Sequence, residues 1–431
     1  MDLPAASSST ALVEDLFRRE YAHLVSALTR ALGPSNLPLA EDVVHDALLS
    51  AMNAWRFGLP RDPKAWIIRA AHNRAIDIIR REQRHRSLLP ELASSAALTD
   101  TIEAALAPSA DGANQLAMMF AVCDPGLSRE TQVTLILRWL CGLSPREIAQ
   151  AFLVGTPTID RRLHRGRARL RELGALPHVD HLPDIEARRS SVLQALYLLF
   201  NEGFHGSNPQ EPVRPFLCAD ALRLTELMLS VRTTSNPDVH ALAGLFCFNT
   251  ARLATRVDED GVFVPLEEQD RGLWDRGLVE RGLAHLASSA TGDRMSRWHL
   301  EAGIACEHAI APSVRDTDWD RIVALYDLLA RQSPSPVVAL NRALAIAERD
   351  GVDEGRRALM ALADDRKLSA YPFYWAARAD LERRAEQLAA ARSSYERAIA
   401  FARSAAERVS YERRLELLDV SGSGQRRSSS S

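Results

Sequence analysis

Two short stretches of the chain concentrate positive charge. Residues 61–86 contain eight basic residues against three acids, and residues 156–171 contain six arginines against one acid, Asp160. Lysine occurs only at Lys64 and Lys367, so arginine supplies nearly every basic contact, a bias that a GC-rich genome would also produce. A guanidinium group binds a phosphate or the edge of a guanine base through two parallel hydrogen bonds. The two stretches therefore indicate nucleic-acid binding, although runs of charge also occur on solvated helix faces.

The rest of the composition limits the class of protein. The chain has 431 residues, of which 46% are hydrophobic and 25% charged, with a formal net charge of −3, as expected for a folded protein of two or three domains. No apolar run approaches the roughly 20 residues of a membrane span, and residues 1–10 lack a secretion signal. We therefore expect a cytoplasmic protein without membrane contact. The cysteines form no C-x-x-C pair, which predicts buried, reduced thiols at Cys123, Cys141, Cys218, Cys247 and Cys306.

Helical periodicity along the chain predicts an all-α fold in several parts. A helical block over residues 11–86 is followed by a polar, Ala/Ser-rich linker over 87–114, with room for one short helix, and a second helical block over 115–174. The largest part, residues 185–420, is also helical in pattern, and the Ser/Gly-rich tail 421–431 is expected to be disordered.

The second block contains the pattern of a helix-turn-helix. Residues 143–171 read LSPREIAQAFLVGTPTIDRRLHRGRARLR, with Ile148, Ala149 and Phe152 on the inner face of one short helix and Ile159 and Leu163 on that of the next. Thr156 and Pro157 suit the N-cap and the first position of the second helix, whose beginning would then face DNA. The alternative is an ordinary pair of helices with a solvated arginine face.

Residues 40–81 supply further context for this motif. They read AEDVVHDALLSAMNAWRFGLPRDPKAWIIRAAHNRAIDIIRR, which is an acidic helix face, a proline-bounded loop and a basic helix that begins with an aromatic residue. With the helix-turn-helix, these segments resemble regions 2 and 4 of extracytoplasmic-function (ECF) sigma factors. The resemblance covers about residues 15–173. It implies two small helical domains on a flexible linker, with region 2 over 11–86 and region 4 over 115–174.

The resemblance also implies roles for individual residues. The acidic face matches the surface that docks on the polymerase β′ subunit. It consists of Glu41, Asp42, His45 and Asp46. Its acids would affect the orientation and the association rate of the partners more than their affinity. The basic helix matches the one that lies along the −10 element. Unstacked bases there need an aromatic and positively charged surface. The matching residues are Trp66, Arg69, Asn73, Asp77, Arg80 and Arg81. Simple alternatives are a solvated helix face for the acids and a core position for Trp66.

In region 4, the resemblance implies that the second helix enters the major groove of the −35 element. The matching positions are Thr158, Arg161, Arg162 and Arg165, with Arg167 continuing toward the phosphates together with Arg169 and Arg171. An acid among them weakens phosphate binding, and we interpret Asp160 as a first-turn residue stabilised by the helix dipole.

The region after residue 185 contains weak repeats. Tyr326 and Tyr395 are 69 residues apart, about twice the 34-residue tetratricopeptide period, and Met360 falls midway. The aromatic and small positions of one repeat are matched by Trp375, Ala379, Ala391, Tyr395 and Ala398. These features predict tetratricopeptide-like (TPR-like) helix pairs from about residue 318, with a helical bundle of coincidental spacing as the alternative.

Two segments, ALYLLFNEGFHGSNPQEPVRPFLCADALRLTELM (195–228) and LEEQDRGLWD (266–275), look like the signatures of the sigma-factor group that carries such an extension. The polar residues near these helices are expected to be caps and buried networks, namely Asn201, Glu202, His205, Asp220, Glu267, Asp270 and Asp275. Glu202 and His205 alone have a spacing compatible with a metal, so we expect no metal and no cofactor.

The resemblance therefore implies a sigma factor that binds the RNA polymerase core through its β′ and β subunits, recognises promoter DNA and assists −10 melting. It implies no covalent chemistry, in line with the absence of a recognised catalytic motif. The extension is expected to regulate through protein contacts. One alternative is a DNA-binding regulator with a helical sensor domain that never joins core polymerase, and another makes the C-terminal half an enzyme.

Overall fold

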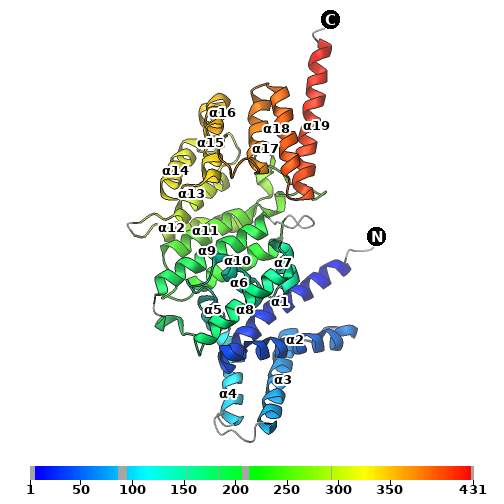
Figure 1. Cartoon of the computed structure of the whole chain (residues 1–431), viewed down its shortest axis with the longest axis vertical. Helices are drawn as coiled ribbons and strands as arrows, with labels where there is room; N and C mark the ends of the chain where they lie inside the picture. Colours follow the sequence, from blue (N-terminus) through cyan, green and yellow to red (C-terminus); the bar gives the residue numbers. More distant parts are fainter. Residues whose placement is uncertain are drawn as a thin grey trace. The chain divides into compact units, whose positions relative to one another are not determined.

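The computed structural model describes residues 5–85, 95–152, 154–182, 184–205, 213–292 and 294–428 (Figure 1). Nineteen α-helices and several 3₁₀ turns make up the regular structure of these residues, and an isolated bridge between Val257 and Phe263 is their only β pairing. The prediction of an all-α fold is confirmed. The chain forms two compact units: unit 1 contains residues 1–199 and 230–234, and unit 2 contains residues 200–229 and 235–431. Within the described helices, none is long and apolar enough to cross a membrane.

The first four helices of unit 1 build one small bundle. They are α1 (Ala5–Leu32), α2 (Leu37–Ala54), α3 (Pro63–His85) and α4 (Ser95–Leu106), and α1 contacts the other three. Fully buried apolar side chains, among them Leu24, Leu28, Val44 and Ile67, fill the space between them. The loop from α2 to α3 begins with the 3₁₀ turn Trp55–Phe57. The outer faces of α2 and α3 are exposed.

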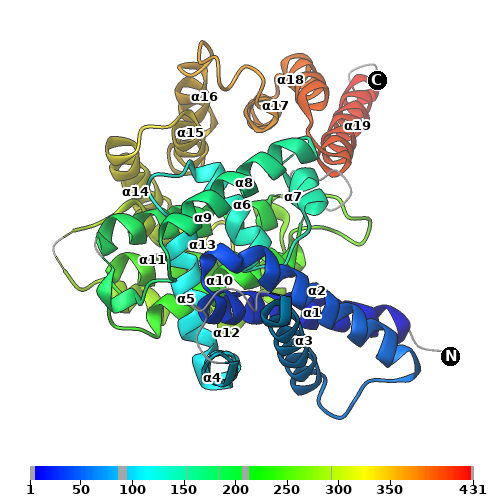
Figure 2. The same cartoon turned by 60° about the horizontal axis from the view of Figure 1, so that its bottom comes forward.

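The segment expected to be a flexible linker is partly built into this bundle. From Ser95 to Leu106 it is α4, which packs against α1 and α3 (Figure 2). Ile102 is fully buried and Leu106 nearly so. The abundance of alanine and serine hid these two apolar positions in the sequence, so the short helix allowed for in the linker is a packed element. Residues 87–94 lie outside the described part of the chain.

The next helices form the predicted second domain, also within unit 1. They are α5 (Asp111–Val122), α6 (Arg129–Trp139), α7 (Pro145–Ala151) and α8 (Thr156–Glu172). A capping box between Ser144 and Glu147 starts α7, and Gly155 rather than Thr156 is the N-cap of α8. Helix α8 packs closely on α6 at Gly166, where a Cβ atom would collide with the side chain of Leu135. Of the expected inner residues, Ile148, Ala149, Ile159 and Leu163 are buried, and Phe152 is half-buried.

The connecting helix α9 (Ile185–Phe204) contains the boundary between the two units. Unit 2 continues with α10 (Pro215–Leu229), α11 (Pro237–Ala251), α12 (Arg276–Ser289) and α13 (Arg297–Ile310). Between α11 and α12 the chain makes three short 3₁₀ turns. Asp270 and Asp275 cap the last of these turns and α12, as expected of them, by accepting hydrogen bonds from the backbone of Gly272 and Leu278.

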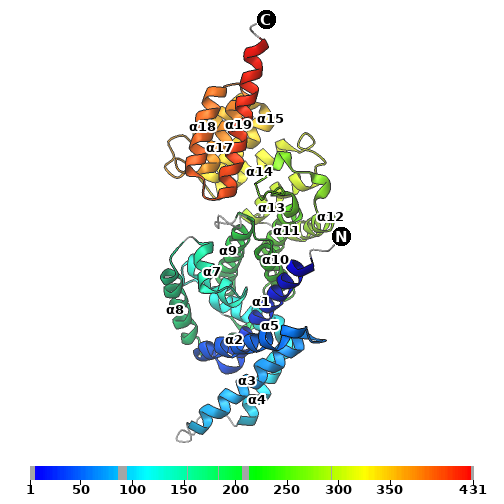
Figure 3. The same ribbon diagram turned by 90° about the vertical axis from the view of Figure 1, so that its right-hand side faces the viewer.

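The end of unit 2 is a series of helices in which each contacts the next (Figure 3). These are α14 (Trp319–Gln332), α15 (Pro336–Asp350), α16 (Val352–Met360), α17 (Pro372–Arg384), α18 (Leu388–Phe401) and α19 (Ala405–Ser428). The predicted repeat positions Trp375, Ala379, Ala391, Tyr395 and Ala398 lie together in one buried core. Met360, which the period places midway between the two tyrosines, is 58% exposed. Helix α19 runs into the tail that the composition predicts to be disordered, and residues 429–431 lie outside the described part.

All five cysteines are buried and none forms a disulfide bond, as the sequence predicts. Burial raises the pKa of four of these thiols above the ordinary value, to about 12 for Cys218 and Cys247 and about 11 for Cys306. A thiol with such a pKa stays protonated and unreactive at neutral pH.

Candidate nucleic-acid interface

One face of α8 is open to solvent along its first three turns. Thr158, Arg161 and Arg165 lie on this face, together with His164, which the sequence analysis did not select. The Arg161 guanidinium donates to the Pro157 carbonyl oxygen at 3.3 Å and to the Thr158 hydroxyl at 3.2 Å, so its direction is held by its own helix. A solvent-facing row of donors at the start of a helix has the form of a major-groove reading surface.

The other arginines predicted on α8 point elsewhere. Arg162 lies over the Phe152 ring, 5.6 Å from its centre, and its Nη1 is 3.5 Å from the Thr134 hydroxyl. Arg167 and Arg169 are ion-paired with acids of the same unit. Asp160 is exposed and lies beyond the first turn of α8, so the expected role as a first-turn acid is wrong. The helix begins at Thr156, one residue earlier than expected, which places Asp160 in the second turn.

Glu41 connects α2 with the helix-turn-helix domain. Its Oε1 accepts hydrogen bonds from Arg138 Nε at 2.9 Å and from the Tyr21 hydroxyl at 3.1 Å, and its Oε2 lies 2.8 Å from Arg167 Nη2. The residue is 7% exposed. Burial alone would raise the pKa of Glu41, but Arg138 and Arg167 outweigh that effect and hold the pKa below its ordinary value. The carboxylate is therefore charged and fully engaged inside unit 1.

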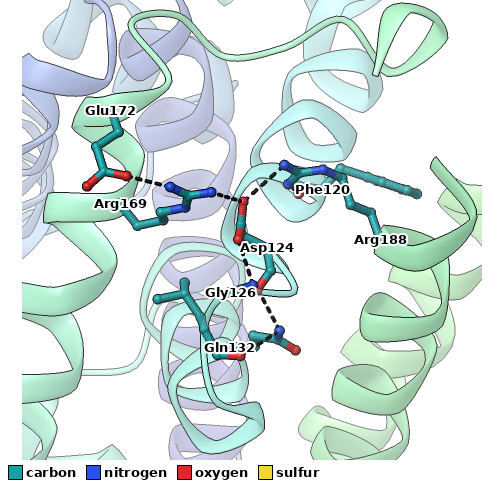
Figure 4. A network of polar contacts seen from close by, with 8 residues as sticks. Phe120, Asp124, Gly126, Gln132, Arg169, Glu172 and Arg188 are labelled. Carbon is teal, nitrogen blue, oxygen red and sulfur yellow. Dashed lines mark hydrogen bonds and ion pairs between the residues drawn. The ribbon is translucent and has the colours of Figure 1, made fainter. Parts of the chain in front are cut away.

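A second acid ties α8 to the connecting helix α9 (Figure 4). Asp124 Oδ2 lies 3.2 Å from Arg169 Nη2 and 3.0 Å from Arg188 Nη2, and its Oδ1 accepts the backbone N–H of Gly126. Arg188 also donates to the carbonyl oxygen of Phe120 at 3.1 Å. Burial would raise the pKa of Asp124, but the hydrogen bond from Gly126 and the two arginines lower it overall. Arg169 is thus tied to Asp124, although its side chain stays partly exposed.

The basic helix of the first bundle, α3, presents a polar outer face. Arg69, Asn73, Asp77, Arg80 and Arg81 are all exposed there, and their spacing of three, four or eight residues places them on one side of a helix. Arg74, which the sequence analysis did not assign, points to α2 and pairs with Asp46 at 2.7 Å. The predicted −10 residues other than Trp66 therefore share one accessible surface.

Trp66 belongs to an aromatic cluster at the beginning of α3. Its ring lies edge-on to that of Trp55, with centres 5.6 Å apart, and Trp55 lies 5.6 Å from Phe17. Trp66 is half-buried. This packing supports the alternative in which Trp66 is a core residue, while its role at the −10 element stays a prediction.

The residues predicted to form the docking face on α2 differ in their exposure to solvent. Asp42 and His45 are exposed, Asp46 is half-buried in its pair with Arg74, and Glu41 is buried. Two exposed apolar residues, Leu49 and Met52, extend the line of Asp42 and His45 along the same side of α2. These four residues are called the α2 stripe below. Leu49 and Met52 were not predicted as surface residues, because apolar residues in a helix are expected in its core.

Comparisons with known proteins agree with this arrangement. Residues 16–85 match sigma-70 region 2, residues 125–170 match sigma-70 region 4, and residues 188–290 match a family of unknown function, DUF6596. An uncharacterized protein of Rhizobium meliloti (strain 1021) is 36% identical over 394 residues, which cover 89% of this chain and 92% of the relative. No solved structure matches the chain. The two sigma regions coincide with the bundle of α1 to α3 and with the helix-turn-helix domain, so the chain carries regions 2 and 4 of a sigma factor, followed by a C-terminal extension.

Proposed function

We propose that this chain is a sigma factor of the ECF type that brings bacterial RNA polymerase core to specific promoters. The observation that carries the proposal is a row of residues at the start of α8 in region 4, in which Arg161, His164 and Arg165 are exposed and Thr158 is half-buried. This row would read the −35 element, with Arg161 and Arg165 as donors to guanine edges or phosphates. The exposed face of α3, with Arg69, Asn73, Asp77, Arg80 and Arg81, would follow the −10 element and assist its melting together with Trp66.

The α2 stripe supports a partner that is a protein and not DNA. Asp42, His45, Leu49 and Met52 combine an acid with exposed apolar surface, which suits a basic, partly apolar protein groove. The proposed partner is the β′ subunit of core polymerase, with further contacts on β. A regulator that binds DNA alone has no use for such a surface, so the stripe favours the sigma factor over that alternative.

In this proposal, the arrangement of unit 1 is a closed form that must open on the promoter. Elements named for positions −35 and −10 are separated by about 25 base pairs, or about 85 Å at 3.4 Å per base pair. Glu41 of region 2 and Arg167 of region 4 are only 2.8 Å apart. Binding to both elements therefore requires that the pairs of Glu41 with Arg138 and Arg167 break. Opening would release Glu41 for polymerase and Arg167 for DNA phosphates.

The C-terminal extension would act through protein contacts, with TPR-like helix pairs from about residue 318. The consecutive helices α14 to α19 and the shared core of Trp375 and Tyr395 support this assignment. The extension would take the place of a separate inhibitor that holds or releases regions 2 and 4. The protein would work in the cytoplasm, use no cofactor and perform no covalent chemistry of its own.

Association with core polymerase tests the proposal. The full chain and purified core enzyme, free of other sigma factors, are mixed and separated by size-exclusion chromatography. We expect the chain to co-elute with core polymerase, and an excess of a known sigma factor should displace it. Binding of the chain to promoter DNA without any association with core would instead establish the regulator.

A further inference from the structure

The guanidinium groups of two arginines of unit 2 lie against one aromatic ring, that of Phe204 at the end of α9. The Cζ atoms of Arg252 and Arg256 lie 4.9 Å and 4.1 Å from the centre of the Phe204 ring. Both arginines follow α11, where the chain turns through Leu253–Thr255. Phe204 and Arg256 are buried, at 3% and 8% exposure. Two like charges thus lie against the same aromatic ring, one of them buried and the other half-buried.

Among the residues that the structure describes, no acid forms an ion pair with either guanidinium group. Arg256 Nε donates to the Phe204 carbonyl oxygen at 2.9 Å, and its Nη2 contacts His205 Nδ1 at 2.5 Å. Arg252 donates only to the side-chain oxygen of Asn249, at 3.1 Å from Nη2. Because a guanidinium group can only donate, His205 must accept and is uncharged. Desolvation by the surrounding protein, together with Arg256, Arg252 and Arg403, lowers the pKa of His205 well below its ordinary value.

A third arginine completes the basic surroundings. Arg403 lies 5.2 Å from the centre of the Phe373 ring, which is itself 6.2 Å from the ring of His205. Arg403 is paired with Glu407 at 3.1 Å, so its charge is compensated. Glu267 acts on Arg252 electrostatically without forming an ion pair. The acids of the described part of the chain therefore leave Arg252 and Arg256 without a direct counter-ion.

Several other buried or half-buried arginines of the chain have an acid or two carbonyl oxygens as partners. Arg138 is paired with Glu41, Arg188 with Asp124 and Arg214 with Glu202. Arg271 is satisfied by the carbonyl oxygens of His308 and Ala311. A buried charge without a partner is strongly unfavourable. Burial and the neighbouring positive charge lower the pKa of Arg256 to about 9, and burial lowers that of Arg252 to about 10.

We propose that Arg252 and Arg256 form a binding site for a phosphate group, either free phosphate or the phosphate of a small organic molecule. Two guanidinium forks on one ring offer the charge-assisted, paired donors that phosphate oxygens accept. His205, which contacts Arg256, is an exposed residue, so solvent reaches the cluster on this side. Phe373 and Tyr371 lie next to Arg403 and would border the organic part of a phosphate ester. A small molecule bound at this site would act on the extension. This holds independently of how the extension acts on regions 2 and 4.

Calorimetric titration of the full chain with sodium phosphate and with glucose 6-phosphate, at constant ionic strength, tests the proposal. The expected result is saturable binding at one site, accompanied by a rise in the unfolding temperature. Tighter binding of glucose 6-phosphate would identify an organic phosphate, and equal or weaker binding would identify free phosphate. Sodium chloride at the same ionic strength should produce neither effect. Absence of saturable binding by both phosphates would overturn the proposal.

The variant Arg252→Gln separates binding from folding. It should weaken phosphate binding at least tenfold, and in phosphate-free buffer it should unfold at the same or a higher temperature, because an uncompensated charge is removed. The matched control is Arg413→Gln in the same unit, which loses an exposed arginine paired with Asp258 and Asp260. The control should bind phosphate like the unaltered chain. Equal phosphate binding by Arg252→Gln and the unaltered chain would contradict the site.

Discussion

The carboxylate of Glu41 and the guanidinium group of Arg167 lie 2.8 Å apart and join region 2 to region 4. The resemblance to sigma factors assigns Glu41 to the polymerase surface and Arg167 to promoter phosphates. In the closed unit 1 these two residues neutralise each other, and Arg138 takes the other oxygen of the same carboxylate. The surfaces for the two proposed partners are thus partly hidden by one ion-pair network.

Glu41→Gln should open this network. Two arginines would lose their counter-ion, at a cost on the order of 3 kcal/mol to unfolding free energy, and Arg167 would be freed for DNA. Denaturant unfolding should show the loss, and fluorescence anisotropy should show tighter binding of the free chain to a −35 duplex. Asp42→Asn, an exposed neighbour on α2, is the control and should change neither quantity. Unaltered stability and DNA binding in Glu41→Gln would refute the closed form.

The same residue predicts a pH dependence. The folded-state pKa of Glu41 is below the ordinary value of 4.5, so its stabilising contribution is fully present above that value. It is lost as the pH falls through the folded-state pKa. The stability difference between the unaltered chain and Glu41→Gln should therefore be constant from about pH 6 to 8 and shrink below pH 4.5. Equilibrium unfolding at a series of pH values measures it, and a difference that grows on acidification would have the wrong sign.

Arg161→Ala should weaken promoter binding by about 1–3 kcal/mol if the side chain reads a base, and by less if it contacts only phosphate. Arg162→Ala should weaken promoter binding by less than the loss of a direct base contact would, because the Arg162 side chain already lies over the Phe152 ring. Binding is measured on an intact promoter and on one with a scrambled −35 element. Equal losses on both DNAs would show that Arg161 does not read bases.

The sequence predicted more of the fold than of the site. The helix-turn-helix was predictable because Ile148, Ile159 and Leu163 recur at helical spacing and are buried in the structure. Long-range pairing was not predictable, since nothing in the local pattern of Glu41 reveals Arg138 or Arg167. The packed α4 was obscured because its burial depends on Ile102 and Leu106 among alanines. Which arginines of α8 face solvent follows only from how that helix packs on α6.

Leu49→Asp combined with Met52→Asp should impair association with core polymerase without unfolding region 2. Both side chains are exposed, at 44% and 57%, so their replacement should change stability by no more than about 0.5 kcal/mol each. Ser50→Asp adds an acid to α2 outside the stripe and is the control. Affinity is measured by titration with labelled core enzyme. If the double variant binds core as tightly as Ser50→Asp does, the α2 stripe is not the docking surface.

Truncation after Asp316 should reduce solubility and alter transcription while DNA binding by regions 2 and 4 persists. The cut removes α14 and uncovers the Leu300 and Ile304 side chains of α13, which pack against Ile322 and Val323. Light scattering of the truncated chain and anisotropy with promoter DNA check the two parts of the prediction. A monodisperse fragment that transcribes like the full chain would contradict a regulatory extension.

The central claim is that the chain directs core polymerase to promoters. Transcription in vitro with purified core enzyme, genomic DNA and the full chain, followed by mapping of RNA 5′ ends, tests it most directly. The account predicts transcripts from a limited set of defined starts that require the chain and are reduced by Arg161→Ala. Transcripts that are the same with and without the chain would contradict the account.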